Sequence, residues 1–290
     1  MKSDDLREGR LRSFDGTEIA TFRQGNKGRW LLLANGLGGN VDAWVHQLAH
    51  FRDRLRFITW DYRSLYKSGR AVNRSFTMED HVRDARLVME EYGVEDAVIV
   101  GWSMGVQVAL EMYRRFPDKV SAMVLTNGTN GKPLDQIFGN RGARWIHKGL
   151  RMAGKVAPMV QPAIAPLAGT PAAIRLMKAS RMVSETLDED VFHKLSGEFA
   201  KLDFADYMEI FVELSRHDAR EILPSISVPT LVFVGGKDFM TRPWMGMEMA
   251  RKIPGAELTV VPGASHYTCV EYPDLFNFRL ERFLTEHGLL

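Results

Sequence analysis

The sequence predicts an α/β protein with a mostly parallel sheet, helices on both faces and an inserted helical segment. Three observations lead to this fold class. Apolar strands alternate with helices to about residue 130, the alternation resumes near residue 229, and residues 131–222 show helical patterns without a clear strand. Strands that alternate with helices form parallel sheets whose two faces are both buried. We therefore expect a core of residues 1–130 and 223–290, and a helical cap, or lid, of residues 131–222.

The core elements follow from local patterns. An Asp-Gly turn at 15–16, followed by the apolar residues 19–22, predicts a hairpin. Residues 77–92 combine a capped start at Thr77 with apolar side chains at helical spacing, which predicts an amphipathic helix. The other expected strands are 30–34, 57–60, 98–100, 120–125, 230–234 and 258–261, and the other expected helices are 42–49, 106–116, 243–252 and 274–285.

Composition and charge argue against several classes of function. The 38 Lys and Arg residues against 36 Asp and Glu residues leave a net charge of +2, which argues against a nucleic-acid surface. A single cysteine, Cys269, excludes an internal disulfide framework and fits a reducing compartment. The N-terminus lacks the apolar core of a signal peptide, and no stretch approaches the ~20 apolar residues that cross a bilayer. We expect a cytoplasmic monomer or homodimer, without stable membrane insertion.

The most informative motif is Gly-Trp-Ser-Met-Gly at residues 101–105, which directly follows an apolar strand and precedes a helix. Gly101 and Gly105 allow the backbone to turn sharply, so that Ser103 projects its hydroxyl from the turn. A serine hydroxyl becomes a nucleophile only with a base beside it and with donors for the developing oxyanion. An isolated G-x-S-x-G can be an ordinary loop, but the strand, turn and helix around it favour a nucleophile here.

A base and an acid follow Ser103 in the chain. Most of the histidines lie in helical patterns, whereas His266 follows the strand 258–261 in a turn-rich loop. Asp238 directly follows the strand 231–234. The loop 126–130 follows the preceding strand and could also carry an acid, but it contains no carboxylate. The order Ser103, Asp238, His266 predicts a Ser-Asp-His triad. Asp61 also ends a strand, and we expect it to anchor its loop through Arg63.

The glycine-rich loop at residues 35–39 follows an apolar strand and is expected to complete the site. The oxyanion would accept hydrogen bonds from the backbone N–H groups of Leu37 and of Met104, the residue after the nucleophile. Phosphate binding by this loop is disfavoured, because the chain contains neither G-x-x-x-x-G-K-S/T nor a proper G-x-G-x-x-G. We expect no cofactor and no metal.

These motifs resemble the α/β-hydrolase fold family over nearly the whole chain, least over residues 131–222. Residues 61–68 are similar to the family's D-x-R-G-x-G-x-S segment, and residues 226–230 are similar to its lead into the acid-bearing strand. The resemblance implies an eight-stranded sheet with an inserted cap. This chain departs from the family pattern at four positions: Asn35 replaces a frequent histidine, and Ser64, Tyr66 and Val106 replace glycines.

The expected activity is that of a serine hydrolase. We expect it to cleave a carboxylic ester of a small or medium apolar substrate through an acyl-enzyme. A serine nucleophile argues against epoxide hydrolase and haloalkane dehalogenase chemistry. C–C bond hydrolysis, thioester cleavage, lactone opening, acyl transfer and cofactor-free perhydrolysis remain open on the same residues, as does a non-catalytic ligand-binding protein of this fold.

The cap is expected to determine the choice of substrate. Its Met- and Ala-rich segments, including Met159, would enclose an apolar pocket with Trp102 and Phe239, or would form a small core of their own. Several prolines within 157–167 argue against one long helix there. A basic run could contact an anionic substrate or a membrane surface, or could be a solvated helix face. It consists of Arg141, Arg144, Lys148, Arg151 and Lys155.

Overall fold

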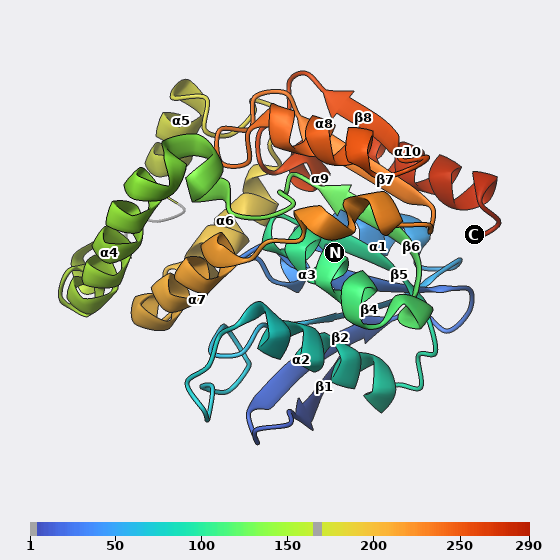
Figure 1. Ribbon diagram of the computed structural model, residues 1–290, viewed down its shortest axis with the longest axis horizontal. Coiled ribbons are helices and arrows are strands. Elements are labelled where there is room, and N and C mark those ends of the chain that lie inside the picture. The colour runs from blue at the N-terminus through green and yellow to red at the C-terminus, as the bar shows by residue number, and fades with distance from the viewer. Residues whose placement is uncertain (1–4, 165–169) are drawn as a thin grey trace.

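A single eight-stranded sheet forms the centre of the computed structural model, which describes residues 5–164 and 170–290 (Figure 1). Its strands are β1 (Arg7–Arg12), β2 (Glu18–Gln24), β3 (Trp30–Ala34), β4 (Arg56–Trp60), β5 (Ala97–Trp102), β6 (Val120–Thr126), β7 (Thr230–Gly235) and β8 (Glu257–Val261). The spatial order is β1-β2-β4-β3-β5-β6-β7-β8. The first two strands pair antiparallel and β2 pairs antiparallel with β4, whereas all later pairs are parallel. The predicted fold class is therefore confirmed.

Each face of the sheet carries its own buried core, because side chains alternate between the faces along every strand. On one face, Leu32 and Ile99 pack with side chains of α2 (Met78–Glu91), α3 (Met104–Arg115) and α8 (Pro243–Lys252). On the other face, Leu33 and Val98 pack with α1 (Val45–Phe51), α9 (Thr268–Glu271) and α10 (Pro273–Glu286). Thr77 caps α2 in a capping box with Asp80, as the sequence predicts. Short 3₁₀ helices at Val41–Trp44, Pro117–Lys119 and Arg220–Ser225 complete the core.

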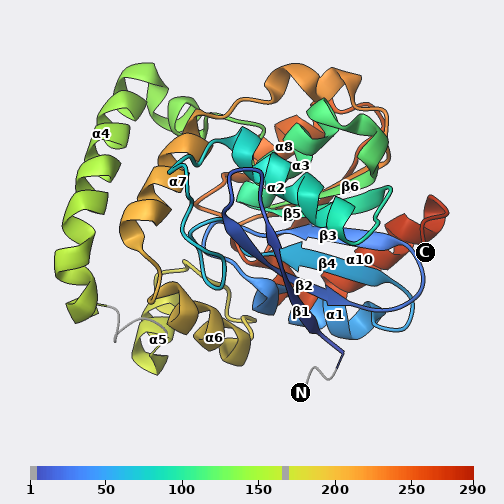
Figure 2. The same ribbon diagram turned by 90° about the horizontal axis from the view of Figure 1, so that it is seen from below.

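The chain between β6 and β7 forms an insertion of helices beside the sheet. The insertion contains α4 (Pro133–Ile164), α5 (Pro171–Ala179), α6 (Glu189–Phe199) and α7 (Phe204–Arg216). In Figure 2 the arrowheads of β3 and β4 point toward the side on which these helices lie. The two ends of the insertion meet, because Gly131 bridges to Asp218 and the Lys132 N–H donates to the His217 carbonyl at 2.8 Å. The insertion therefore lies at the carboxyl edge of the parallel strands.

The helix α4 differs from the expectation for the proline-rich segment. It continues through Pro158 and Pro162 to Ile164, so the predicted break is wrong for that stretch. A proline removes one backbone donor and can bend a helix without ending it. The interruption lies instead at Gly139, whose φ of 67° and ψ of 164° are not helical. The remainder of the segment, 165–167, lies outside the described residues.

Candidate active site

Ser103 lies at the sharp turn between β5 and α3, with φ 55° and ψ −113°. A non-glycine residue with positive φ is strained, and such strain is held at functional sites by the surrounding structure. A Cβ on Gly101 would lie 2.3 Å from the Gly105 carbonyl oxygen, and one on Gly105 would lie 1.9 Å from that of Ala34. Both positions therefore require glycine, and the turn presents Ser103 at the N-terminus of α3.

Val106 illustrates how the chain accommodates a departure from the family pattern. Its side chain lies against Gly128, where an added Cβ would meet Val106 Cγ2 at 2.3 Å. Gly128 belongs to the loop after β6. Because Gly128 has no side chain, it leaves the room that the Val106 side chain needs. The packing of α3 on the sheet is thus preserved.

Asp238 and His266 form a buried, hydrogen-bonded pair at the carboxyl ends of β7 and β8. His266 Nδ1 lies 2.9 Å from Asp238 Oδ2, and the two residues are 3% and 2% exposed. Asp238 Oδ2 also accepts hydrogen bonds from Thr241 Oγ1 and Asn127 Nδ2, and Oδ1 accepts them from the Met240 and Thr241 N–H groups. Burial raises the pKa of Asp238, but the charge of His266 and these hydrogen bonds outweigh it and hold the pKa below its usual value. The carboxylate is therefore ionised beside the imidazole.

Hydrogen bonds to backbone carbonyls connect the segments that carry this pair to the segment that carries Ser103. The Trp102 indole N–H donates to the His266 carbonyl at 2.8 Å, and the Ser103 N–H donates to the Thr126 carbonyl at 2.9 Å. Asn127, the next residue, donates to both Asp238 and the Ser265 carbonyl. Within the described part of the chain, Ser103 Oγ and His266 Nε2 make no hydrogen bond, which is common before a substrate is bound. The three predicted residues thus follow the carboxyl ends of β5, β7 and β8, with β6 between β5 and β7.

The loop at residues 35–39 lies directly beside the serine, since a Cβ on Gly36 would be 3.2 Å from Ser103 Cβ. Asn35 anchors this loop: its side chain accepts from the Trp44 indole at 2.7 Å and donates to the Trp60 carbonyl at 2.9 Å. The backbone N–H groups of Leu37 and Met104 donate no hydrogen bond to any described residue.

Ser64 and Tyr66, which replace family glycines, adopt positive φ angles of 64° and 52°. The backbone conformation of the glycine pattern is therefore retained with side chains present. The Tyr66 hydroxyl donates a hydrogen bond to the Gly38 carbonyl. The Ser64 hydroxyl accepts a hydrogen bond from the Ala71 N–H at 3.0 Å. These two contacts tie the loop at residues 61–68 to the neighbouring backbone.

Sequence reasoning missed Asn127, Thr241 and Glu271. Asn127 comes from the loop that offers no carboxylate, and its amide reaches the carboxylate of Asp238. Glu271 is buried and accepts hydrogen bonds from the N–H groups of Ser265 and Ser184, both at 2.7 Å. It therefore joins the loop that carries His266 to the helical insertion. Only the position of Thr241, three residues after Asp238, gave a local signal.

The predicted substrate-contact residues lie in three different environments. Trp102 is 4% exposed and packs beneath the glycine loop, where Cβ atoms on Gly36 and Gly39 would meet its ring at 3.0 and 2.6 Å. Phe239 is 42% exposed beside Asp238. Met159 is 83% exposed on α4, so its side chain faces solvent rather than a pocket. Its predicted role was inferred from hydrophobicity alone, and the structure is against it.

Asp61 does not contact Arg63, so that expectation is wrong. Arg63 pairs instead with the buried Asp84 on α2 at 2.8 Å, because a fully buried guanidinium is stabilised by an equally buried carboxylate. Asp61 Oδ2 accepts from the Lys67 N–H at 3.1 Å, whereas its Oδ1 has no hydrogen-bond partner in the described residues. Burial raises the pKa of Asp61 to about 7. With Asn40 and others, Asp61 lines a pocket of about 480 Å³.

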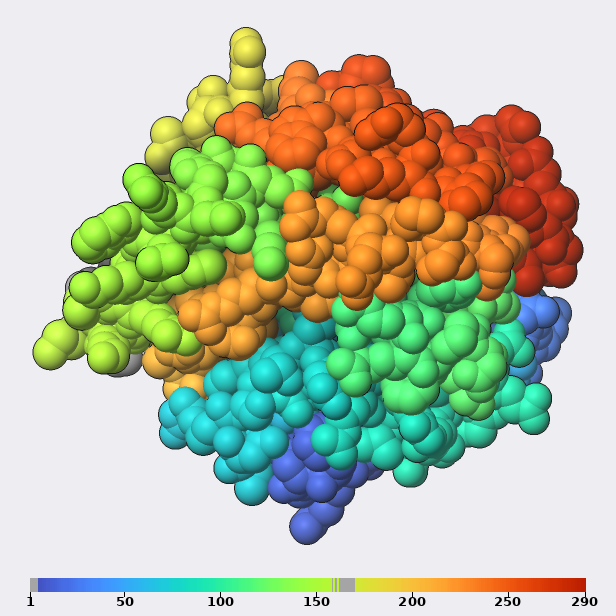
Figure 3. Space-filling view, in the orientation of Figure 1, coloured from blue at the N-terminus to red at the C-terminus, as the bar shows by residue number. Residues whose placement is uncertain are grey.

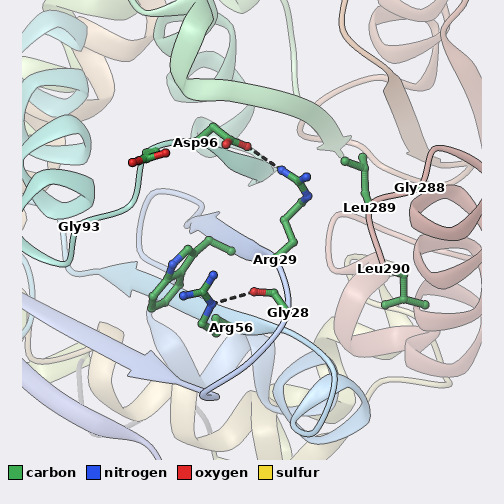
Figure 4. Close-up of a pocket in the computed structure, with 10 residues that line it drawn as sticks. Gly28, Arg29, Arg56, Gly93, Asp96, Gly288, Leu289 and Leu290 are labelled. Carbon is green, nitrogen blue, oxygen red and sulfur yellow. Dashed lines mark hydrogen bonds and ion pairs between the residues drawn. The ribbon is translucent and has the colours of Figure 1, made fainter.

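A further pocket, of about 510 Å³, lies at the amino ends of the parallel strands (Figure 4). It is lined by Trp30 and Arg56, which begin β3 and β4, and by Asp96, which precedes β5. Arg29 pairs with Asp96 at 2.7 Å, and Arg56 donates to the Gly28 carbonyl at 2.8 Å. Because it lies at the amino ends of the strands, this pocket is remote from Ser103.

The fold, and Ser103 at the sharp turn between β5 and α3, define the class of the protein as a hydrolase with a mostly parallel sheet. A family model of the alpha/beta hydrolase fold matches residues 29–273, and the chain belongs to this family. It is 26% identical to 3-oxoadipate enol-lactonase 2 of Acinetobacter baylyi over 265 residues, covering 90% of each chain. It is 28% identical to the pimeloyl-[acyl-carrier protein] methyl ester esterase of Neisseria meningitidis over 195 residues, covering 67% of this chain and 70% of the esterase.

A solved structure agrees on the fold. The enol-lactonase from Burkholderia xenovorans LB400 superposes with a TM-score of 0.76 at 22% identity, covering 96% of this chain and all (100%) of that one. At this identity the likeness concerns the fold alone.

Proposed function

We propose that this protein is a serine hydrolase that cleaves a carboxylic ester of a small or medium apolar substrate through an acyl-enzyme. The observation that carries the proposal is the strained φ of Ser103, at a helix N-terminus beside a buried His266–Asp238 pair. Strain of this kind is maintained only where the surrounding structure enforces it. Three groups with complementary roles at one sheet edge are the arrangement that acyl transfer requires.

In the proposed mechanism, His266 Nε2 accepts the proton of Ser103 as the hydroxyl oxygen attacks the ester carbonyl. Asp238 accepts from Nδ1, which keeps Nε2 unprotonated before the attack and stabilises the imidazolium after it. His266 then gives the proton to the leaving alkoxide. Water, activated by His266 in the same way, attacks the acyl-enzyme and releases the acid.

The oxyanion of the tetrahedral intermediate would accept hydrogen bonds from the Leu37 and Met104 N–H groups. Neither group has another acceptor among the described residues, so binding the oxyanion breaks no existing hydrogen bond. The N-terminus of α3 adds positive potential at the same position. A preorganised donor of this kind is worth about 10²- to 10³-fold in turnover.

For the substrate pocket, we propose that Leu37, Trp102 and Phe239 form the wall nearest to the serine and that residues 131–222 act as the lid. Phe239 is partly exposed beside Asp238, and the glycine loop that carries Leu37 adjoins Ser103. A lactone is the second candidate substrate, because a relative that aligns over most of the chain is an enol-lactonase. Linear and cyclic esters undergo the same attack at the carbonyl.

The test is a fluorophosphonate probe together with p-nitrophenyl esters of increasing acyl length and a series of lactones. Ser103→Ala should abolish probe labelling and lower kcat/KM by about 10⁴-fold or more. Ser225→Ala is the matched control, because Ser225 is an exposed serine just before β7, at the opposite end of the strands. Retained turnover in Ser103→Ala, or labelling of both variants alike, would refute the proposal. Labelling without turnover of any ester or lactone would favour a ligand-binding role.

A further inference from the structure

The outer face of α4 carries a stripe of large apolar side chains that no other described element covers. Trp145, Met152, Val156 and Met159 are 73%, 56%, 45% and 83% exposed. They are separated by seven, four and three residues, so they share one side of the helix after Gly139. Figures 1 and 2 both show α4 at the outer edge of the molecule, and Figure 3 shows its side chains projecting there. We call these four residues the apolar stripe.

The opposite face of α4 accounts for the packing of this helix. Ala143 and Ala157 are buried, and a Cβ on Gly154 would lie 3.1 Å from Met208 Cβ of α7. His147 Nε2 lies 2.6 Å from Ser215 Oγ, also of α7. Small residues and the half-buried Leu150 thus form the face toward α7, while four large apolar residues face outward. A helix that only covers a protein core is expected to keep its large apolar residues on the packed face.

A basic stripe runs beside the apolar one. It consists of Arg141, Arg144, Lys148, Arg151 and Lys155, all exposed, and residues 140–164 contain no Asp or Glu. Arg151 approaches Glu209 and Glu213 at 3.7 and 3.9 Å. The other four make no ion pair within the described residues, although the Lys148 ammonium lies 5.6 Å from the centroid of the Trp145 ring. The stripe therefore retains about four unneutralised positive charges.

We propose that this face of α4 docks reversibly on the surface of an anionic lipid bilayer. The apolar stripe would enter the boundary between headgroups and acyl chains, and the basic stripe would bind the anionic headgroups. Charge complementarity identifies the occupant. A symmetrical contact with a second copy would bring two cationic stripes together, whereas an anionic bilayer attracts both stripes at once. Among the helices in the described residues, none is long and apolar enough to span a membrane.

Vesicle flotation tests this docking directly, and it does not depend on the proposed hydrolase activity. The protein carries Ser103→Ala, so that no lipid is hydrolysed during the measurement. Vesicles of phosphatidylglycerol and phosphatidylcholine in about a 1:3 ratio should carry the protein, and phosphatidylcholine alone should not. Salt at about 0.5 M should release it, because screening shortens the range of the attraction. Failure to float would overturn the docking proposal and leave the proposed function intact.

Matched variants distinguish the stripes from general charge and hydrophobicity. Lys148→Gln should weaken binding about fivefold. Lys27→Gln, which removes the same charge from an exposed loop elsewhere, should leave binding unchanged. Trp145→Ala should weaken binding about tenfold, and Phe278→Ala, at a 62% exposed aromatic on α10, should have no effect. Equal effects within either pair would overturn the proposal, as would a dimer that Trp145→Ala dissociates in sedimentation.

Discussion

Replacement of Asp238 by asparagine is the sharpest test of the proposed triad, because the structure determines how the amide must be oriented. Asp238 Oδ1 accepts two backbone N–H groups, from Met240 and Thr241, and these donors cannot be reversed. The amide oxygen of the variant must therefore take the Oδ1 position. Its NH₂ group then takes the Oδ2 position, facing His266 Nδ1 and the Asn127 amide.

This orientation places the proton of His266 on the wrong nitrogen. With an NH₂ donor beside it, Nδ1 must become the acceptor, so the neutral imidazole carries its proton on Nε2. A protonated Nε2 cannot accept the proton of Ser103, and the imidazolium also loses its counter-charge. The same type of replacement in serine proteases costs about 10⁴-fold in kcat, or about 5.5 kcal/mol of transition-state stabilisation. We expect a loss of this order near neutral pH.

The assay is kcat/KM for a p-nitrophenyl ester, with thermal unfolding monitored by circular dichroism to establish that the variant is folded. Thr241→Val serves as the matched control, because it deletes the side-chain donor to Oδ2 at 2.7 Å but keeps the backbone donor and the carboxylate charge. We expect it to retain activity within about tenfold. A folded Asp238→Asn variant within tenfold of the wild type would show that another group orients His266.

Two further predictions concern loops around the site. Asp61→Asn should stabilise the protein above neutral pH. Burial raises the pKa of Asp61 to about 7 from 3.8, so the carboxyl group ionises at lower pH in the unfolded chain than in the folded protein. The free energy of unfolding of the wild type therefore falls as pH rises between these two pKa values. The advantage of the variant in urea unfolding should grow from pH 5 to pH 8 toward about 4 kcal/mol, and an advantage that shrinks would contradict this reasoning. Tyr66→Phe removes only the hydroxyl that donates to the Gly38 carbonyl and should lower kcat about three- to tenfold with KM unchanged. An unaltered kcat would mean that this contact does not position the oxyanion loop.

The sequence by itself determined the elements of the core. Strand and helix signals are local, because hydrophobic period, caps and turn residues act within a few positions. The capping box at Thr77 and the two glycines around Ser103 appear in the structure as the sequence predicts. The candidate triad was found in the same way, since each of its members lies in the turn or loop after a strand and parallel strands end at one edge.

Only the tertiary structure decided which distant residues meet. The contacts of Asn127 with Asp238 and of Glu271 with Ser184 join segments far apart in the chain, and no local pattern encodes them. The partner of Arg63 was mistaken for the same reason, since the choice between Asp61 and Asp84 depends on how α2 packs.

Exposure was also decided by the tertiary structure. Met159 has the hydrophobicity of a pocket residue, yet it lies in solvent because Ala143, Gly154 and Ala157 form the face of α4 that packs on α7. An amphipathic pattern shows that a helix has two faces, but the residues that lie opposite determine which face is buried. The basic run alone could equally be a solvated face; the exposed apolar stripe beside it became visible only when the packing of α4 was known.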